Sequence, residues 1–599
     1  MTIRDLLSPF TAWKNLFRDP VTIRDPLNDR PGAARYRGFH QNDAAKCIGC
    51  GTCEAICQNG AIDMLPAPGI ATKQGDSGLR PRIDYGRCCW CALCVDVCMT
   101  GSLRMSNAYK WVETDPDRFR FTPGVEKQPW DDAELGYRRP EGHQITGRLR
   151  VEMGEMAPEA RIDSFAEIVD GYTVEQARLE ADRCVACGLC IATCPTHMAI
   201  PEYIAAVRDG DYERGIKLLY DTNPFSGICG RVCTRKCETS CAARHEGDAI
   251  AIRWLKRHIM DQVSFEQCVA AVGKPAPTTG KKIAIIGAGP AGLTAAFDLA
   301  KKGHQVTVYE ALDKPGGMTR WGIPEYRLPY DKIDQDVNVI RSLGVEIRCN
   351  TRIGQDIALA TLREQNDAVL IALGLQLGRA TRIPGSDHAD VRKAVDLLRQ
   401  ATAGEAFGMP KQAVVIGGGN VAMDIARTLG RLQKQQYGEV RVTVTALEDF
   451  AHFLADPDEV KEAGEEGIQI LDARGPQNVV VENGRVTGLK TWRVKSIFDA
   501  QGRFAPSYDQ GDEQFHPGEM VVEAIGQMSD TGLLGDALTE RLEWNRGRLK
   551  VDAGGRTSET WLWAAGDMVR GPDVVSAVAD GHRVAASIHA ALTQPEPAP

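Results

Sequence analysis

The stretch from Lys281 to Glu310 reads KKIAIIGAGPAGLTAAFDLAKKGHQVTVYE, and its pattern decides the fold of the second half of the chain. It opens with a short apolar run, Ile283 to Ile286, that is typical of a buried parallel strand. Three glycines follow at the spacing G-x-G-x-x-G: Gly287, Gly289 and Gly292. This spacing allows a tight turn, close approach to a pyrophosphate and close packing of helix on strand. A second strand, Gln305 to Tyr309, ends at Glu310, which can bind ribose hydroxyls. We therefore predict a dinucleotide site rather than a purely structural turn.

The length and composition indicate a multidomain globular protein. The chain has 599 residues, 43% of them hydrophobic, and a net charge of -9, which argues against a nucleic-acid binder. No apolar run reaches about 18 residues, and the first residues lack the apolar core of a signal peptide, so we expect neither a transmembrane span nor export. Nineteen cysteines without a secretion signal favour metal ligation over disulfides.

Eight cysteines in the first hundred residues repeat the spacing C-x2-C-x2-C-x3-C. Two-cluster ferredoxins have this spacing, and the fourth cysteine of each run binds the other cluster. The spacing therefore predicts one 4Fe–4S cluster on Cys47, Cys50, Cys53 and Cys98, and a second on Cys88, Cys91, Cys94 and Cys57. Zinc is the alternative, but zinc sites usually show paired C-x2-C units.

Two further cysteine runs follow a predicted helix at residues 173–182: Cys184, Cys187, Cys190 and Cys194, then Cys229, Cys233, Cys237 and Cys241. From about residue 164 to the C-terminus, these runs and the dinucleotide stretch resemble the small (β) subunit of bacterial glutamate synthase. The resemblance implies a helical domain with two more 4Fe–4S clusters. It places one on Cys184, Cys187, Cys190 and Cys241, and three corners of the other on Cys194, Cys233 and Cys237.

The fourth ligand of that last cluster is a separate prediction. Family members can use a downstream polar side chain, but this chain has Lys256 there, and an ammonium group has no lone pair to offer. Cys229 is the available thiolate, and we predict it as the ligand. The alternative is that Cys229 is a buried, inert thiol.

The same resemblance implies that the first dinucleotide site binds FAD. Two further segments match the flavin-domain signature, GGM followed by RWGIPEYRLP at residues 316–329 and AAGD at residues 564–567. The implied cofactor-binding residues are Gly287, Gly289, Pro290, Ala291, Gly292, Glu310, Gly317, Met318, Arg327, Gly566 and Asp567. Segments 369–374 and 522–526 resemble the crossovers at which the flavin domain gives way to an inserted domain and resumes.

The predicted insert carries a second dinucleotide turn, GGGNVAMD, after the strand at residues 413–416. Its predicted nucleotide contacts are Gly417, Gly419, Asn420, Val421 and Glu448. NADPH-using members of the family carry an Arg pair for the 2′-phosphate where this chain has Leu447 and Glu448. A carboxylate repels a phosphate but accepts hydrogen bonds from a free ribose, so we predict NAD(H). In the alternative, Glu448 is a solvated charge and another arginine binds the phosphate.

The predicted fold is therefore multidomain, with an α+β ferredoxin domain, a helical iron–sulfur domain and two α/β Rossmann-type domains. The expected parts are an N-terminal partner-docking extension (1–40), the two-cluster ferredoxin domain (41–110), an irregular connector (111–163), the helical 4Fe–4S domain (164–273), the FAD domain (281–400 and 526–599) and the inserted NAD domain (401–525). The docking role rests on an apolar stripe at helical spacing: Leu6, Phe10, Trp13 and Phe17. The first 110 residues, with RYRGF at 35–39, resemble the ferredoxin-type subunit of respiratory complex I.

Together these motifs predict an oxidoreductase that connects hydride chemistry to single-electron carriers. A flavin accepts a hydride from NADH and passes single electrons to clusters, and no acid–base residue is required. We expect a cytoplasmic diaphorase subunit that exchanges electrons with a partner such as hydrogenase, formate dehydrogenase, ferredoxin or a respiratory-type complex. Attachment to the membrane surface through such a partner is an alternative location. The alternative functions are an NADPH-dependent glutamate synthase small subunit and a wiring subunit without turnover. No cysteine pair follows Gly292 closely, which excludes a disulfide reductase of the thioredoxin-reductase class.

Overall fold

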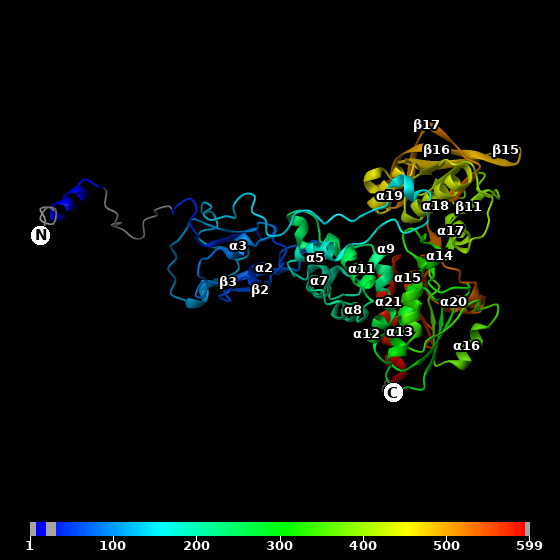
Figure 1. The fold of residues 1–599 in the computed structure, drawn as a ribbon, viewed down its shortest axis with the longest axis horizontal. Helices are drawn as coiled ribbons and strands as arrows, with labels where there is room; N and C mark the ends of the chain where they lie inside the picture. The colour runs from blue at the N-terminus through cyan, green and yellow to red at the C-terminus, as the bar shows by residue number, and fades with distance from the viewer. Residues whose placement is uncertain (1–7, 19–31, 594–599) are drawn as a thin grey trace. The chain divides into compact units, whose positions relative to one another are not determined.

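The computed structural model describes residues 8–18 and 32–593 of the chain (Figure 1). The chain divides into two compact units, an N-terminal unit that ends at Gly147 and a C-terminal unit that begins at Arg148. All nineteen cysteines lie in the described residues, and none forms a disulfide. No helix in the described part of the chain is long and apolar enough to cross a membrane.

The N-terminal unit is built from short strands and single-turn helices around two cysteine runs. One sheet pairs β1 with β4, and the other has the antiparallel order β2-β3-β5. The bounds of these elements are β1 His40–Asn42, α2 Thr52–Ala55, β2 Ile62–Pro66, β3 Leu79–Asp84, α3 Leu93–Asp96, β4 Leu103–Met105 and β5 Arg120–Phe121. Helices α2 and α3 hold the third cysteine of each run, Cys53 and Cys94, against a core that includes Ile83 and Met105.

The predicted irregular connector is divided between the two units. Residues 111–147 belong to the N-terminal unit, where they cover β1. The indole nitrogen of Trp130 donates to the backbone oxygen of His40 at 3.1 Å, and its ring stacks on Phe39 with centroids 4.2 Å apart. Aromatic packing and backbone hydrogen bonds, rather than regular secondary structure, therefore hold this segment in place.

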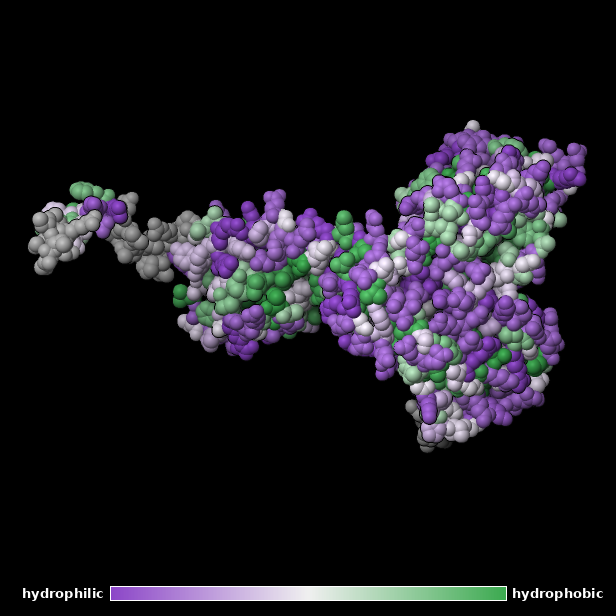
Figure 2. Space-filling model, in the orientation of Figure 1, coloured by the Kyte–Doolittle hydropathy of each residue, from purple (hydrophilic) through white to green (hydrophobic). Residues whose placement is uncertain are grey.

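Part of the N-terminal apolar stripe is described. Residues Ser8–Asn15 form a 3-10 helix, η1. Phe10, Trp13 and Phe17 are exposed, at 61%, 68% and 93%. Leu6 lies outside the described residues. Figure 2 also shows hydrophobic residues on the visible face of the N-terminal unit.

The first part of the C-terminal unit is helical and carries the other two cysteine runs. Helix α5 begins with a capping box in which Thr173 and Gln176 bond each other's backbone N–H groups. The bounds are α5 Val174–Asp182, α6 Leu189–Thr193, α7 Ile200–Asp209, α8 Tyr212–Tyr220, α9 Ser226–Val232, α10 Lys236–Thr239, α11 Ile252–Gln262 and α12 Phe265–Val272. The predicted helix at residues 173–182 matches α5.

The first α/β domain has a parallel sheet of order β22-β9-β6-β7-β8. Its strands are β6 Lys282–Ile286, β7 Gln305–Tyr309, β8 Glu346–Arg348, β9 Ala368–Ile371 and β22 Leu562–Ala564. The helices include α13 Pro290–Lys301, α14 Met318–Trp321, α15 Tyr330–Arg341, α16 Leu359–Gln365, α20 Gly535–Arg541 and α21 Val574–Thr593. Helix α21 packs closely on α13 because Gly581 has no side chain to keep Ala291 and Thr294 away.

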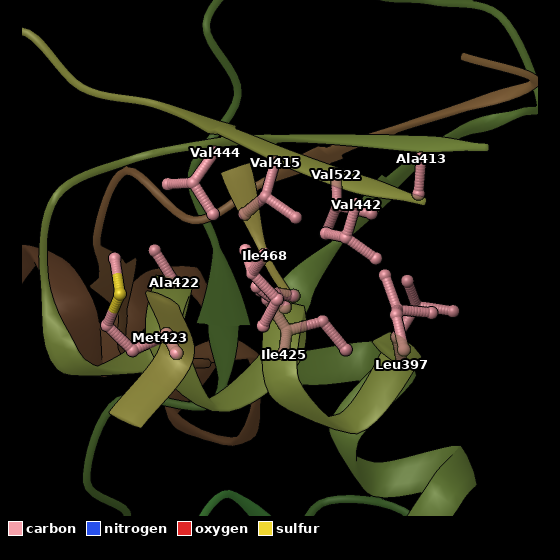
Figure 3. Packing of buried hydrophobic residues seen from close by; sticks show 14 of the residues in the cluster. Leu397, Ala413, Val415, Ala422, Met423, Ile425, Val442, Val444, Ile468 and Val522 are labelled. Carbon is pink, nitrogen blue, oxygen red and sulfur yellow. The ribbon is translucent and has the colours of Figure 1, made fainter. Parts of the chain in front are cut away.

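The second α/β domain has a parallel sheet of order β11-β18-β12-β13-β14. Its elements are β11 Val391–Lys393, α17 Ala394–Ala403, β12 Ala413–Ile416, α18 Asn420–Tyr437, β13 Val442–Thr445, α19 Pro457–Glu465, β14 Gln469–Leu471 and β18 Met520–Glu523. Val415, Val444 and Val522 from the sheet pack on Ile425 of α18 and Leu397 of α17 (Figure 3).

This second sheet begins before the expected domain boundary at residue 401, because β11 pairs with β18 and α17 packs on the same core. In the sequence its strands lie between β9 and β22 of the first sheet. A three-stranded antiparallel sheet extends the domain: β15 Arg474–Glu482, β16 Arg485–Phe498 and β17 Phe504–Pro517.

Candidate functional site

The first glycine turn joins β6 to α13 and lines a large cavity. Gly287 has a φ of 106°, and a side chain there would strike the backbone oxygen of Ala372. Gly289 has ordinary extended backbone, and an added Cβ would find nothing nearer than Gly317 Cα at 3.8 Å. Gly292 packs helix on strand, since a side chain would strike Gly287. The three glycines therefore have the three roles that the fingerprint requires.

The cavity beside this turn has a volume of about 430 Å³. Most of the residues predicted for the first dinucleotide line it: Gly287, Gly289, Pro290, Ala291, Glu310, Gly317, Met318, Gly566 and Asp567. Sequence analysis missed other lining residues, including Arg352, Gln376 and Arg399. Arg352 and Gln376 lie in loops and Arg399 lies in helix α17, and no sequence motif marks these positions.

Two carboxylates in the cavity wall differ in their partners. Glu310, at the end of β7, accepts the Ala288 N–H at 2.9 Å and the Leu312 N–H at 3.0 Å. Burial raises the pKa of Glu310. Burial, and then the charge of Asp573, raises the pKa of Asp567 to about 6. Glu310 therefore bonds the backbone of the turn, whereas Asp567 lies in the cavity wall near the carboxylate of Asp573.

Arg327 is absent from the cavity lining, although the sequence predicts it as a cofactor contact. Its guanidinium lies 2.6 Å from Asp424 of α18 and 2.6 Å from Glu459 of α19. Glu459 also pairs with the fully buried Arg427, which contacts Glu466 at 2.7 Å. The structure thus places Arg327 in a buried ion-pair network that joins the two α/β domains.

The second glycine turn joins β12 to α18. Gly417 has a φ of 143°, and no atom lies within 4 Å of a Cβ added to Gly419. The side chain of Asn420 accepts the Asp456 N–H at 2.7 Å. This turn has the same shape as the first one: a constrained first glycine and an open middle glycine at the start of a helix.

Glu448 faces this second turn. A Cβ added to Gly418 would lie 2.9 Å from Oε2 of Glu448, which is half-buried. The neighbouring Arg474 bonds Ala446 through its backbone, but its guanidinium pairs with Asp512 at 2.9 Å. The predicted carboxylate therefore lies beside the turn, and the adjacent arginine already has an anionic partner.

The eight cysteines of the N-terminal unit form two groups. A cavity of about 80 Å³ is lined by one predicted set, Cys57, Cys88, Cys91 and Cys94, and also by Cys89, which lies outside the predicted spacing. In the other set, burial raises the pKa of Cys47, and the charges of Cys98 and Cys50 add to the rise. The structure thus brings Cys57 of the first run beside the cysteines of the second run, and cluster ligation by the two sets stays a prediction. No three His, Cys, Asp or Glu side chains among the described residues converge closely enough to hold a single metal ion.

The cysteines of the helical domain also surround two cavities, each of about 20 Å³. One is lined by Cys184, Cys187, Cys190 and Cys241. The other is lined by Cys194, Cys233 and Cys237, together with Lys256. Cys229, predicted as the fourth ligand, is fully buried in α9 and is not among the lining residues.

Lys256 is 4% exposed and takes the place beside the three cysteines. Burial opposes its charge, yet the nearby thiolates of Cys233 and Cys229 raise the pKa of Lys256. Burial raises the pKa of Cys229, and the charge of Lys256 is the largest of the effects that lower it. Cys229 as a ligand therefore stays a prediction, and the structure offers Lys256 as a cation next to this group of thiolates.

Three family descriptions match this chain. Residues 281–592 match the pyridine nucleotide-disulphide oxidoreductase family, residues 161–268 match domain II of dihydropyrimidine dehydrogenase with its 4Fe–4S cluster, and residues 46–102 match a 4Fe–4S dicluster domain. The chain belongs to the pyridine nucleotide-disulphide oxidoreductase family, with iron–sulfur domains added before it.

Curated relatives match about two thirds to three quarters of this chain. The small chain of glutamate synthase [NADPH] from Escherichia coli is 31% identical, over 74% of this chain and 98% of that protein. Subunit PreT of the NAD-dependent dihydropyrimidine dehydrogenase of E. coli is 34% identical, over 71% of this chain and 96% of its own length. The beta subunit of the NADP(+)-dependent formate dehydrogenase of Moorella thermoacetica is 37% identical over 68% of this chain, which spans only 60% of that subunit. The predicted resemblance to the glutamate synthase small subunit is confirmed.

The residues present fit the groups that the family implies. Open space at Gly289 and at Gly419 leaves room for a pyrophosphate at each turn, where a side chain would fill it. Thiolates are the ligands of 4Fe–4S clusters, and three cavities are each lined by at least three cysteines. The chain is thus an oxidoreductase built for FAD, a pyridine nucleotide and iron–sulfur clusters.

Proposed function

We propose that this protein is an NAD(H)-dependent iron–sulfur flavoprotein that moves electrons between NADH and a partner through FAD and four 4Fe–4S clusters. In this proposal the second α/β domain is the NAD domain, inserted in the FAD domain between β9 and β22. The proposed cluster ligands are the sixteen cysteines of the four runs, Cys229 included.

One observation carries the proposal: a single helix contributes to both a flavin-sized cavity and a cysteine cavity. At the start of α21, Val575 lines the cavity of Cys194, Cys233 and Cys237, and Ala577 lines the 430 Å³ cavity. Two residues along a helix correspond to a rise of about 3 Å. The two cavities are therefore close neighbours, as electron transfer from one to the other requires.

Side chains of the flavin domain also hold this cysteine cavity in place. Asp336 of α15 accepts the Ile228 N–H at the start of α9 at 3.0 Å. Lys236, beside Cys237, contacts Asp573 at 2.9 Å just before α21 begins. These contacts fix the helical domain against the flavin domain, so the distance between the two sites is set by the fold.

The residues around each site bind and orient, and none needs to move a proton. When bound, FAD accepts a hydride from the nicotinamide and releases single electrons to the clusters. The glycine turns seat the two pyrophosphates on helices α13 and α18, and Glu310 fixes the first turn.

NADPH is the second candidate cofactor, because some relatives are named for it. The relative PreT is named as NAD-dependent. Glu448 beside the second turn supports NAD(H) in this chain. An NADPH-dependent glutamate synthase small subunit would be the corresponding alternative function.

The partner is proposed by chemical class. Relatives are named as subunits of formate dehydrogenase and of dihydropyrimidine dehydrogenase. We propose that this chain serves as the diaphorase subunit for a redox enzyme or ferredoxin in the same way, with the exposed Trp13 and Phe17 contributing to docking.

Anaerobic reduction of an artificial acceptor by the isolated chain with NADH tests whether the chain has diaphorase activity of its own. A chain that binds FAD but transfers no electrons from either nucleotide would instead be a passive wiring subunit.

The four-cluster proposal predicts about sixteen iron and sixteen acid-labile sulfide per chain, because each cubane contributes four of each. The measurement is anaerobic iron and sulfide analysis of fully reconstituted protein. A matched variant, Cys349→Ser, removes a thiol that lines none of these cysteine cavities and should retain the full iron content. Cys94→Ser should lose about four iron if the ferredoxin assignment holds. A plateau near eight iron, or stoichiometric zinc, would reject the four-cluster proposal.

A further inference from the structure

The imidazole of His40 lies against Cys94, a predicted cluster ligand in the N-terminal unit. Its two ring nitrogens have different partners. The side chain is 1% exposed, and it lines the cavity of Cys57, Cys88, Cys91 and Cys94. Its Nε2 atom lies 3.3 Å from Sγ of Cys94. Its other ring nitrogen, Nδ1, lies 2.7 Å from the hydroxyl of Tyr85.

The Tyr85 hydroxyl can bond both the backbone N–H and Nδ1 of His40. Its oxygen accepts that N–H at 2.7 Å, and its own proton can be donated to Nδ1. This direction is the one that fits a cysteine bound to a cluster, because such a sulfur has no proton and can only accept from Nε2. In the neutral ring the remaining proton is then on Nε2 and points at Cys94. The doubly protonated ring also has a proton on Nε2. The hydrogen bond to Sγ of Cys94 is therefore available in both protonation states of His40.

The surrounding residues hold this arrangement rigidly. Trp130 donates to the backbone oxygen of His40 at 3.1 Å, and Trp90 lies nearly parallel to its ring, with an angle of 25°. Tyr85 packs on Phe39 and Phe121. These contacts restrict the buried ring, so its Nε2–H keeps one direction toward Cys94. A solvent-exposed donor would be free to rotate.

We propose that His40 is a positioning residue that donates an Nε2–H···Sγ hydrogen bond to Cys94 and raises the reduction potential of the cluster at Cys57, Cys88, Cys91 and Cys94. The inference rests on the proposed function in one respect, namely that a cluster is bound there. Hydrogen bonds to the ligand sulfurs are among the factors that set a cluster's potential. Reduction adds negative charge, and a donor aimed at the sulfur stabilises the reduced form more than the oxidised form.

This bond differs from the others at the same cluster because a side chain makes it. Cys57 accepts the Ala61 N–H at 3.3 Å, and Cys88 accepts the Trp90 N–H at 3.4 Å. Those backbone donors survive any change of side chain. The His40 donor can be removed alone, so its contribution to the potential is separable by mutation.

The test compares His40→Leu with His40→Gln in the full chain, because glutamine retains an N–H donor and leucine has none. EPR-monitored redox titration should show one cluster whose reduced-to-oxidised ratio at a fixed potential falls about tenfold in H40L, equal to about 59 mV for one electron. H40Q should recover part of this shift, and the iron content of both should equal that of the wild type. An unchanged potential in fully loaded H40L would overturn the inference.

A spectroscopic measurement on the wild type makes the test independent of how the variants fold. Protein labelled with ¹⁵N at histidine alone should show a histidine nitrogen coupled to a reduced cluster by pulsed EPR, and H40Q should lose this coupling. Loaded wild-type protein without the coupling would overturn the inference while leaving the proposed function intact. Wild-type protein that takes up no cluster at these cysteines would instead reject the proposed function.

Discussion

NADH is expected to reduce the flavin about tenfold to more than a hundredfold better than NADPH, measured as kcat/KM. The 2′-phosphate of NADPH would place like charge against Glu448, which lies at the second glycine turn. Loss of a charged hydrogen bond, with a group left unpaired, costs roughly 1.5–3 kcal/mol. Each 1.36 kcal/mol is about tenfold in rate. Anaerobic stopped-flow reduction of the flavin by each nucleotide measures the ratio directly.

Leu447→Arg combined with Glu448→Arg should move the preference toward NADPH, because two arginines supply the fork that binds a phosphate. Asp449→Asn is the matched control. It removes one negative charge at the next position. Asp449 is exposed, and its Oδ1 atom lies 2.6 Å from Nδ1 of His452. The control should retain the preference for NADH. Equal reduction of the wild type by both nucleotides, or faster reduction by NADPH, would show that another arginine binds the phosphate.

Gly289→Ala is expected to weaken FAD binding without unfolding the protein. The backbone at Gly289 is extended, with a φ of -85°, and the nearest atom to an added Cβ is 3.8 Å away. The methyl group therefore fits the protein but stands where the pyrophosphate approaches the turn. We expect FAD affinity to fall more than about tenfold, or more than about 1.4 kcal/mol.

The measurements are FAD released per chain, the Kd from a flavin titration, and the Tm of both apo-proteins. The apo-proteins are compared because bound FAD would itself stabilise the wild type. Gly464→Ala, at an exposed helical glycine with no atom within 4 Å, is the control and should retain FAD. Gly419→Ala should retain FAD and lose reduction by NADH. Full FAD content in G289A would mean that the pyrophosphate does not lie at this turn.

Local sequence patterns predicted the elements around both glycine turns closely. The strand expected at residues 283–286 is β6 Lys282–Ile286, and the strands at 305–309 and 413–416 have the predicted bounds. Each pattern depends on neighbours within a few residues: apolar runs, glycines that permit special backbone angles, and a terminal acidic residue. The cysteine partition of the N-terminal unit was also predictable, because ferredoxin spacing itself specifies which cysteine crosses over.

The sequence by itself therefore determined the class of protein and the two glycine turns, and it predicted the cysteine sets. Only the tertiary structure decided that β11 joins the second sheet, that Arg327 pairs with Asp424, and that Lys256 rather than Cys229 lines a cysteine cavity. The same holds for the bond from His40 to Cys94, 54 residues away. The physical reason is that these contacts join residues far apart in the chain. Their partners are chosen by packing and burial, which leave no periodic trace in the sequence.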